Sequence, residues 1–189
     1  DLAQGQQELL LGPGMRAQLL ALEEVDFITA YSAAYCTIAQ SPRPDDLHLI
    51  GGFSQEQLAF FPDNDAVLAG TTDYDELIKH NGIIVTRDGE NLLHKLYHLD
   101  LALGHTVTLQ SAAGITKDYT VMGIVDRFQK GSGTAKMLIL PEDELHTLYP
   151  NITDFTGFIN IHTTQTGVGR QALYDLLDDP RIEISALSD

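Results

Sequence analysis

The chain has very little cysteine. Cys36 is the only one, so no disulfide can form within the chain. It stands in residues 31–38, which we expect to be a strand, where a buried thiol acts as a small apolar side chain. One cysteine does not distinguish an oxidising compartment from a reducing one.

A long apolar run is missing as well. The longest stretch without charge, residues 27–42, is interrupted by Thr29, Ser32, Thr37 and Gln40. A membrane helix needs about 20 consecutive, mostly apolar residues, so we expect none here and a soluble polypeptide. The sequence does not begin with methionine or with a basic and then apolar leader, which predicts a mature or excised part of a longer protein.

Basic residues are scarce. The chain has 11 of them against 27 acidic residues, which gives a formal net charge of −16. Such a charge repels phosphate backbones and anionic lipids, so nucleic acid is excluded as a partner. The imbalance is steepest up to Ile78, where 13 acidic residues face only Arg16 and Arg43, a net charge of −11. Solubility is the main explanation, and cation binding or steering of a partner is the alternative.

What is present indicates an ordinary folded protein, because 43% of the residues are apolar and 20% are charged. Periodicity and cap residues predict helices over 15–22, 54–61, 73–80 and 165–177, and a further one capped by Asp88. Strands are expected over 25–39, 47–50, 83–86, 105–109, 119–125, 138–140, 155–162 and 181–184. Strands and helices mix without a regular βαβ repeat, so the predicted fold class is α+β.

The segment 82–128 is the most informative. After the strand 83–86 we expect a helix with one leucine face, namely Leu92, Leu93, Leu96 and Leu99. Leu103-Gly104 ends the helix, and the strands 105–109 and 119–125 form a hairpin with Gly123 as a bulge or close-packing point.

With these residues in view, the segment resembles the extracytoplasmic (periplasmic) core domain of MacB-like and FtsX-like ABC transporter permeases. The Leu-Gly-Asp-Thr-Val-x-Leu strand of that family is similar to residues 103–109, with His105 at the acidic position, and its Thr-Val-x-Gly-Ile-Val strand is similar to 120–125. Residues 136–145 are similar to its strand that ends in a helix-opening proline, and 15–25 to its first helix.

The resemblance implies an α/β lobe, like the porter lobe of the family, built from 1–62 plus 134–189. A β-rich lobe, 63–133, would be inserted between these two parts. Relative motion of the lobes is expected at Pro62 and at the loop 129–134.

The resemblance further implies a non-catalytic domain outside a bacterial cell membrane, between the first and second membrane helices of a permease. The domain would transmit ATP-driven motion to substrate export or to an outside partner. The implied partners are a cognate ABC ATPase subunit or domain, a second permease protomer and an extracytoplasmic protein.

Histidines and acids offer two candidate metal sites. His94 and His98 are four residues apart and would share a helix face, with Asp100 or His105 as a third ligand. No glutamate follows His94, and surface histidines are the commoner explanation. Calcium could use 63–65 together with Asp73, Asp75 and Glu76, but the spacing does not fit an EF-hand.

Catalytic and anion-binding motifs are incomplete. Residues 131–136 lack the Gly-Lys-Ser/Thr ending of a phosphate loop, and 52–56 lack the second glycine of a nucleophile elbow. The triplet 151–153 matches a glycosylation acceptor. We therefore expect no catalytic, cofactor-binding or metal-binding residues and no cofactor. The alternatives are a secreted cation- or ligand-binding or adhesion module that uses the acidic N-terminal half and, after it, an unrecognised hydrolase.

Overall fold

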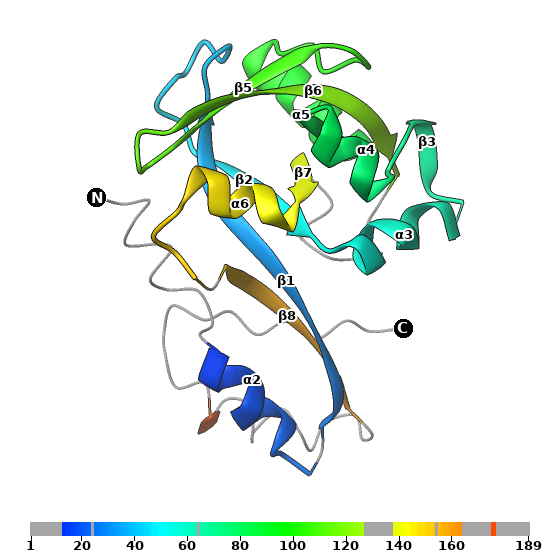
Figure 1. Cartoon of the computed structure of the whole chain (residues 1–189), viewed down its shortest axis with the longest axis vertical. Coiled ribbons are helices and arrows are strands. Elements are labelled where there is room, and N and C mark those ends of the chain that lie inside the picture. The colour runs from blue at the N-terminus through cyan, green and yellow to red at the C-terminus, as the bar shows by residue number, and fades with distance from the viewer. Residues whose placement is uncertain are drawn as a thin grey trace.

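The structure is a computed structural model that describes residues 13–23, 25–63, 65–126, 138–153, 155–163 and 175–176. The helices are α2 (Pro13–Leu20), α3 (Gln55–Asp63), α4 (Tyr74–Lys79), α5 (Arg87–Tyr97) and α6 (Glu142–Leu148). The strands are β1 (Val25–Ile38), β2 (His48–Phe53), β3 (Val67–Gly70), β4 (Gly82–Thr86), β5 (Thr106–Ser111), β6 (Thr116–Val125), β7 (Leu138–Pro141) and β8 (Thr156–Thr163). The predicted α+β class is confirmed. A rounded body stands on a narrow arm (Figure 1).

Six strands of the body close into a ring. Their order is β1–β2–β7–β4–β6–β5, and β5 returns to β1. Two pairs, β2–β7 and β4–β6, are parallel, and the other pairs of the ring are antiparallel. Cys36 of β1 closes the ring, because it pairs with His48 on one edge and with Ser111 on the other. We call these six strands the ring; β3 adds to it by pairing with β6.

Side chains alternate between the inside and the outside of the ring, as the pleat of a strand requires. Ile83 and Val85 belong to an inner cluster, while Ile84 between them belongs to an outer cluster. β7 repeats this pattern, with Leu138 and Leu140 inside and Ile139 outside. β4 is buried along its whole length, which explains its nearly continuous β-branched sequence.

Helices cover both clusters. Leu93 of α5 and Leu145 and Leu148 of α6 join the inner cluster, whereas Leu58 of α3 and Leu77 of α4 join the outer one. The helices therefore complete the two apolar layers that the alternating strands begin.

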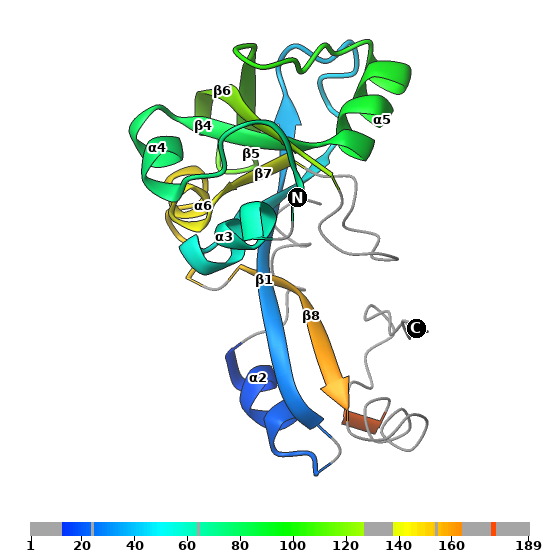
Figure 2. The same ribbon diagram turned by 90° about the vertical axis from the view of Figure 1, so that its right-hand side faces the viewer.

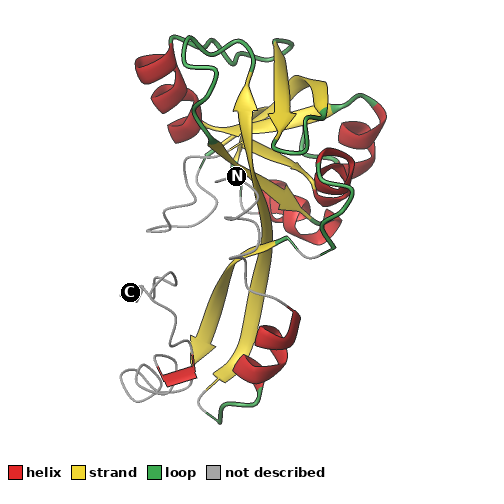
Figure 3. Ribbon diagram, turned by 90° about the vertical axis from the view of Figure 1, so that its left-hand side faces the viewer, coloured by secondary structure: helices red, strands yellow, loops and turns green. Residues whose placement is uncertain are grey.

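The arm is built from the first half of β1, from β8 and from α2. Residues Val25 to Tyr31 pair antiparallel with β8, so that Val25 lies opposite Thr163 at the far end. α2 packs beside β1, where Leu19 is fully buried. Seen from the two sides, the arm is a narrow extension of the body (Figures 2 and 3).

Helix starts test the cap predictions. The Ser54 cap is confirmed: Gln57 N donates to Ser54 Oγ (3.2 Å), and Ser54 N donates to Gln57 Oε1 (3.0 Å). The prediction that Asp88 caps α5 was wrong. Thr86 is the cap, since its Oγ1 accepts a hydrogen bond from Gly89 N (3.1 Å). β4 runs into α5 without a loop, which places Asp88 inside the first turn.

The predicted leucine face of α5 is only partly correct. Leu93 is buried, but Leu96 is 52% exposed. His98 takes a left-handed conformation (φ 52°) and ends the helix, so Leu99 reaches the core from the following segment. The helical period therefore fails at its last turn.

Glycines explain two further results. The strand predicted over 47–50 continues as β2 through Gly51 and Gly52 to Phe53. A Cβ on Gly52 would collide with Leu145, so the glycine lets α6 pack against the strand. Gly123 is confirmed as a close-packing point beside a register shift, because a Cβ there would collide with the carbonyl oxygen of Thr71.

Where the described residues cover them, the bounds of the remaining predicted elements agree with the structure within one or two residues. The exception is β6, which begins three residues before the predicted strand. Pro62 lies inside α3, which runs one residue further. The loop 129–134 and the strand 181–184 lie outside the described residues, as does the helix 165–177 apart from two helical residues, 175–176. The ring joins strands from both predicted lobes, and the borders at 62 and 133 stay a prediction.

Candidate functional site

A buried polar network joins β6 to α6. Glu144 Oε2 accepts hydrogen bonds from Lys117 Nζ (2.6 Å) and from Tyr119 Oη (2.8 Å). Burial, and then the hydrogen bond with Glu144, raises the pKa of Tyr119, so the phenol keeps its proton and donates. Two donors meet one carboxylate oxygen, and the network ties the helix to the ring.

A second polar contact is made by the phenol of Tyr149, just after α6. Its hydroxyl donates to the carbonyl oxygen of Tyr35 in β1 and accepts a hydrogen bond from Ala112 N (3.0 Å) in the β5–β6 turn. Burial raises the pKa of Tyr149. One side chain thus connects three segments of the body.

Tyr149→Phe should lower the free energy of unfolding by about 1–3 kcal/mol, because it leaves two backbone groups without their partner. Urea denaturation measures this change. Tyr97→Phe is the control, since the Tyr97 hydroxyl bonds Asp46 (3.0 Å) near the surface and water can replace that contact. Equal losses in the two variants would contradict the structural role of Tyr149.

A shallow pocket of about 420 Å³ lies where α5 leads into β5, and His98, Asp100 and His105 line it with Gln40. The His105 Nδ1 atom is 2.9 Å from the Asp100 carbonyl oxygen, so the ring is held by the backbone. The Gln40 side-chain amide bonds Thr108 twice: its Nε2 donates to Thr108 Oγ1 (2.8 Å), and its Oε1 accepts from Thr108 N (3.0 Å). The polar groups of this pocket mostly hold the pocket wall together.

The histidines considered as metal ligands differ in backbone conformation. His94 lies within α5, whereas His98 is left-handed (φ 52°) and ends the helix, so the regular helical spacing assumed for the pair does not hold at His98. Among the described residues, no group of three or more His, Cys, Asp or Glu side chains could hold a metal ion.

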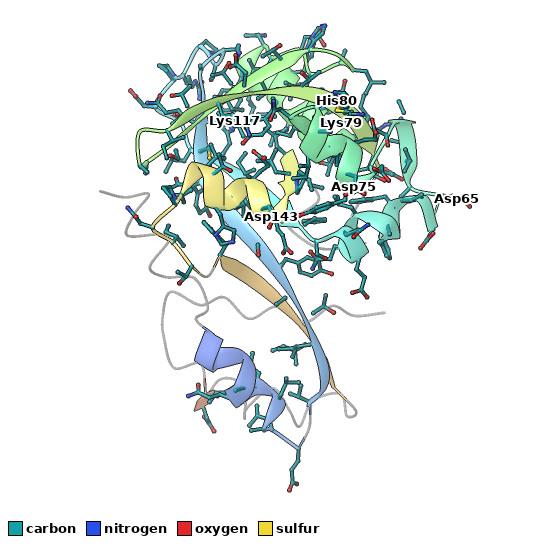
Figure 4. The ribbon with its side chains drawn as sticks, in the orientation of Figure 1. Asp65, Asp75, Lys79, His80, Lys117 and Asp143 are labelled. Carbon is teal, nitrogen blue, oxygen red and sulfur yellow. The ribbon has the colours of Figure 1, made fainter. Side chains whose placement is uncertain are left out.

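Acidic residues occupy the first turns of α3, α4 and α6, and Figure 4 labels Asp65, Asp75 and Asp143 in this part of the body. An open groove of about 620 Å³ has Glu56 and Glu142 among its lining residues. Tyr74 also lines it and donates to Asp143 Oδ2 (3.0 Å); burial first, and then this bond, raises the pKa of Tyr74 to about 12. Asp65 and Asp75 are exposed, and Asp65 has a left-handed backbone (φ 54°).

The acids considered for calcium serve local structure. Asp73 Oδ1 accepts from Glu76 N (2.9 Å) as the cap of α4. Glu76 lies near Lys79 (3.8 Å) and His80 (3.4 Å) on the same helix. Of the incomplete motifs, the segment 52–56 contains Ser54, whose hydroxyl caps α3. The loop 131–136 lies outside the described residues. In the glycosylation triplet 151–153, Asn151 and Thr153 are exposed in a turn.

One cluster was missed from the sequence. His48 packs edge-on against Tyr97 (4.9 Å between ring centroids), and its buried Nε2 has no hydrogen-bond partner within the described part of the chain. Burial lowers the pKa of His48, opposed by the charge of Asp46. Asp46 also accepts from the Tyr97 hydroxyl and lies 3.9 Å from Arg43. The only local signal was the Arg43–Asp46 spacing, which says nothing about Tyr97.

Cys36 is the small buried side chain that we expected. Its exposed fraction is 0%, and burial raises its pKa to about 12. Compared with the usual 9.0, this reduces the thiolate at neutral pH about a thousand-fold.

Reaction of Cys36 with an aromatic disulfide reagent at pH 8 should therefore be slow in the folded chain and fast in urea. The reaction is followed by absorbance, with Leu96→Cys as an exposed control that reacts at once. Rapid labelling of folded Cys36 would show that the ring opens near β1.

Every helix in the described parts of the chain is too short or too polar to cross a membrane.

No family model and no curated protein matches the sequence. Among solved structures, the periplasmic region of MacB from Actinobacillus actinomycetemcomitans is 11% identical, with 86% of this chain and 71% of that one covered and a TM-score of 0.45. The extracellular domain of the ABC-type transporter YknZ from Gram-positive bacteria is 14% identical, with 94% and 88% covered and a TM-score of 0.45. Similarity at this level does not assign the chain to a family.

Proposed function

We propose that the chain is the extracytoplasmic domain of an ABC transporter permease in a bacterial membrane, and that it transmits ATP-driven motion without catalysing a reaction. The sequence motifs support this. Residues 103–109 form the turn before β5 and its first strand residues, and 120–125 form the end of β6, which pairs with both β4 and β5. The matching motifs thus belong to β5 and β6, two neighbouring strands of the ring.

The observation that carries the proposal is the continuity of β1. This strand of 14 residues pairs with β8 in the arm and then closes the ring between β2 and β5. Because no loop interrupts it, a single hydrogen-bonded strand joins the arm to the body. Such a strand suits a domain that transmits motion.

The polar side chains support the same proposal. Glu144, Tyr149 and Asp73 are occupied by contacts that hold helices or turns in place. A mechanical domain needs packed bodies and a point of movement and no titratable catalytic pair. Its partners would be a cognate ABC ATPase, a second permease protomer and an extracytoplasmic protein.

The test uses the intact transporter in lipid nanodiscs, with a spin label at Lys95→Cys on the exposed face of α5 in both protomers. Binding of ATP should shift the distance between the two labels, measured by pulsed electron paramagnetic resonance. The control is an ATPase subunit that cannot bind ATP, which should remove the shift. An unchanged distance with ATP bound would contradict the proposal and favour a binding or adhesion module.

A further inference from the structure

The arm joins the ring at a bulge. Ser32 of β1 pairs with Gly52 of β2 on one edge and with Thr156 of β8 on the other. The preceding residue, Tyr31, lies opposite Phe158. One step along β1 therefore corresponds to two steps along β8. Gly157 is therefore left unpaired, and a bulge of this kind bends and twists a strand pair.

The ring side of the bulge is fixed. Ala33 N donates to the carbonyl oxygen of Phe155 (2.8 Å). The Phe155 ring is 4% exposed within the inner cluster, where it packs edge-on against His146 and Tyr149. The residue just before β8 is therefore anchored in the body.

One polar side chain of the body reaches across the bulge. Gln57 is part of α3, and its Nε2 donates to the carbonyl oxygen of Ala30 in the arm (2.9 Å). Its Oε1 accepts from Ser54 N, so both ends of the amide are occupied. β2 pairs with β1 only from Ser32 onward, and Gln57 takes up the backbone carbonyl just before that point.

An apolar contact supports the amide. The Tyr31 ring is 4% exposed and packs against Phe53 (5.7 Å between centroids) in the outer cluster. A ring contact and a hydrogen bond thus both link the arm side of the bulge to the body.

We propose that the arm turns on the body at Ser32 and Gly157, and that Gln57 holds it at the observed angle. This point of movement differs from Pro62 and the loop 129–134 that the resemblance implied. Its use as a lever rests on the proposed function, but the movement itself is a property of this chain.

The substitution Gln57→Glu removes the hydrogen bond from Gln57 to the Ala30 carbonyl oxygen but keeps the helix cap. A glutamate keeps the Oε1 acceptor for Ser54 N and so keeps the capping box. It loses the N–H donor and sets a carboxylate against the Ala30 carbonyl oxygen. Gln55→Glu is the matched control, because it adds the same charge to an exposed position of the same helix.

The measurement is pulsed electron paramagnetic resonance on the chain in solution, with labels at Gln18→Cys in α2 and Lys95→Cys in α5, both exposed. Cys36 does not take up label because it is buried. Gln57→Glu should broaden the distance distribution and raise the population of turned arms roughly 2- to 10-fold, the factor that the loss of one hydrogen bond produces. Gln55→Glu should match the wild type.

Two outcomes would overturn the proposal. One is a distribution in Gln57→Glu equal to that of the wild type. The other is equal broadening in both variants, which would assign the effect to charge on α3. Circular dichroism confirms that the variants are folded. No ATP or membrane is involved, so a failed nanodisc test leaves this measurement valid, and failure here leaves the distance between protomers as a separate question.

Discussion

Gly70→Ala should lower the free energy of unfolding by about 2–5 kcal/mol, the largest effect that we expect from one methyl group in this chain. The estimate joins about 1–2 kcal/mol for a left-handed alanine with about 1–3 kcal/mol for overpacking. Urea denaturation followed by circular dichroism measures the change.

The cause lies at the end of β3. Gly70 has a φ of 75° and pairs with Gly123 of β6. A Cβ at this position would collide with the carbonyl oxygen of Met122, far inside the 3.0 Å that real Cβ atoms keep. That carbonyl already accepts a hydrogen bond from Thr71 N (2.8 Å), so it cannot move without breaking the contact between β3 and β6.

Gly114→Ala is the control. Gly114 has a similar φ of 80°, but its Cβ would meet nothing within 4 Å. The substitution therefore carries only the backbone cost, about 1–2 kcal/mol. Equal effects in the two variants would show that β3 yields easily and that the Met122 contact is not limiting.

Lys117→Met should destabilise the chain by about 2–3 kcal/mol. It leaves the Glu144 carboxylate, whose side chain is 11% exposed, bonded to the Tyr119 hydroxyl but without its ammonium partner. Removing one partner of a fully buried ion pair costs about 3–5 kcal/mol, and the cost is smaller here because the Lys117 side chain is 26% exposed. Thermal and urea unfolding both report the loss.

A double variant tests the interpretation. Adding Glu144→Leu to Lys117→Met removes the unpaired charge and should recover part of the lost stability, so the two effects will not add. Lys79→Met is the surface control: its partner Glu76 is 3.8 Å away and both side chains are exposed, so we expect a change within about 0.5 kcal/mol. Additive losses in the double variant would contradict a coupled pair.

Local features were the ones that the sequence could predict. The Ser54 capping box needs residues three apart, and the hairpin of β5 and β6 needs only alternation around a short turn. Asp88 failed as a cap because two residues of suitable type, Thr86 and Asp88, lie close together and only the backbone path decides between them.

The ring was beyond the sequence for a different reason. Alternation shows which side chains of a strand share a face, but it does not show which strand lies beside it. β4 lies between β6 and β7, although α5 and β5 separate it from β6 along the chain and β6 also separates it from β7. The Lys117–Glu144 pair and the contact of Gln57 with Ala30 both follow from such distant pairings and have no local pattern.

The order in which the ring is completed has a consequence for biosynthesis. β7 lies between β2 and β4, so the ring stays open until residues 138–141 have been made. Until then β2 and β4 each keep a free edge, and β4 is wholly apolar apart from Gly82 and Thr86. Free edges of this kind pair readily with other chains. Nascent chains that stop before β7 should therefore aggregate, and a holding chaperone would be needed between the synthesis of β4 and that of β7.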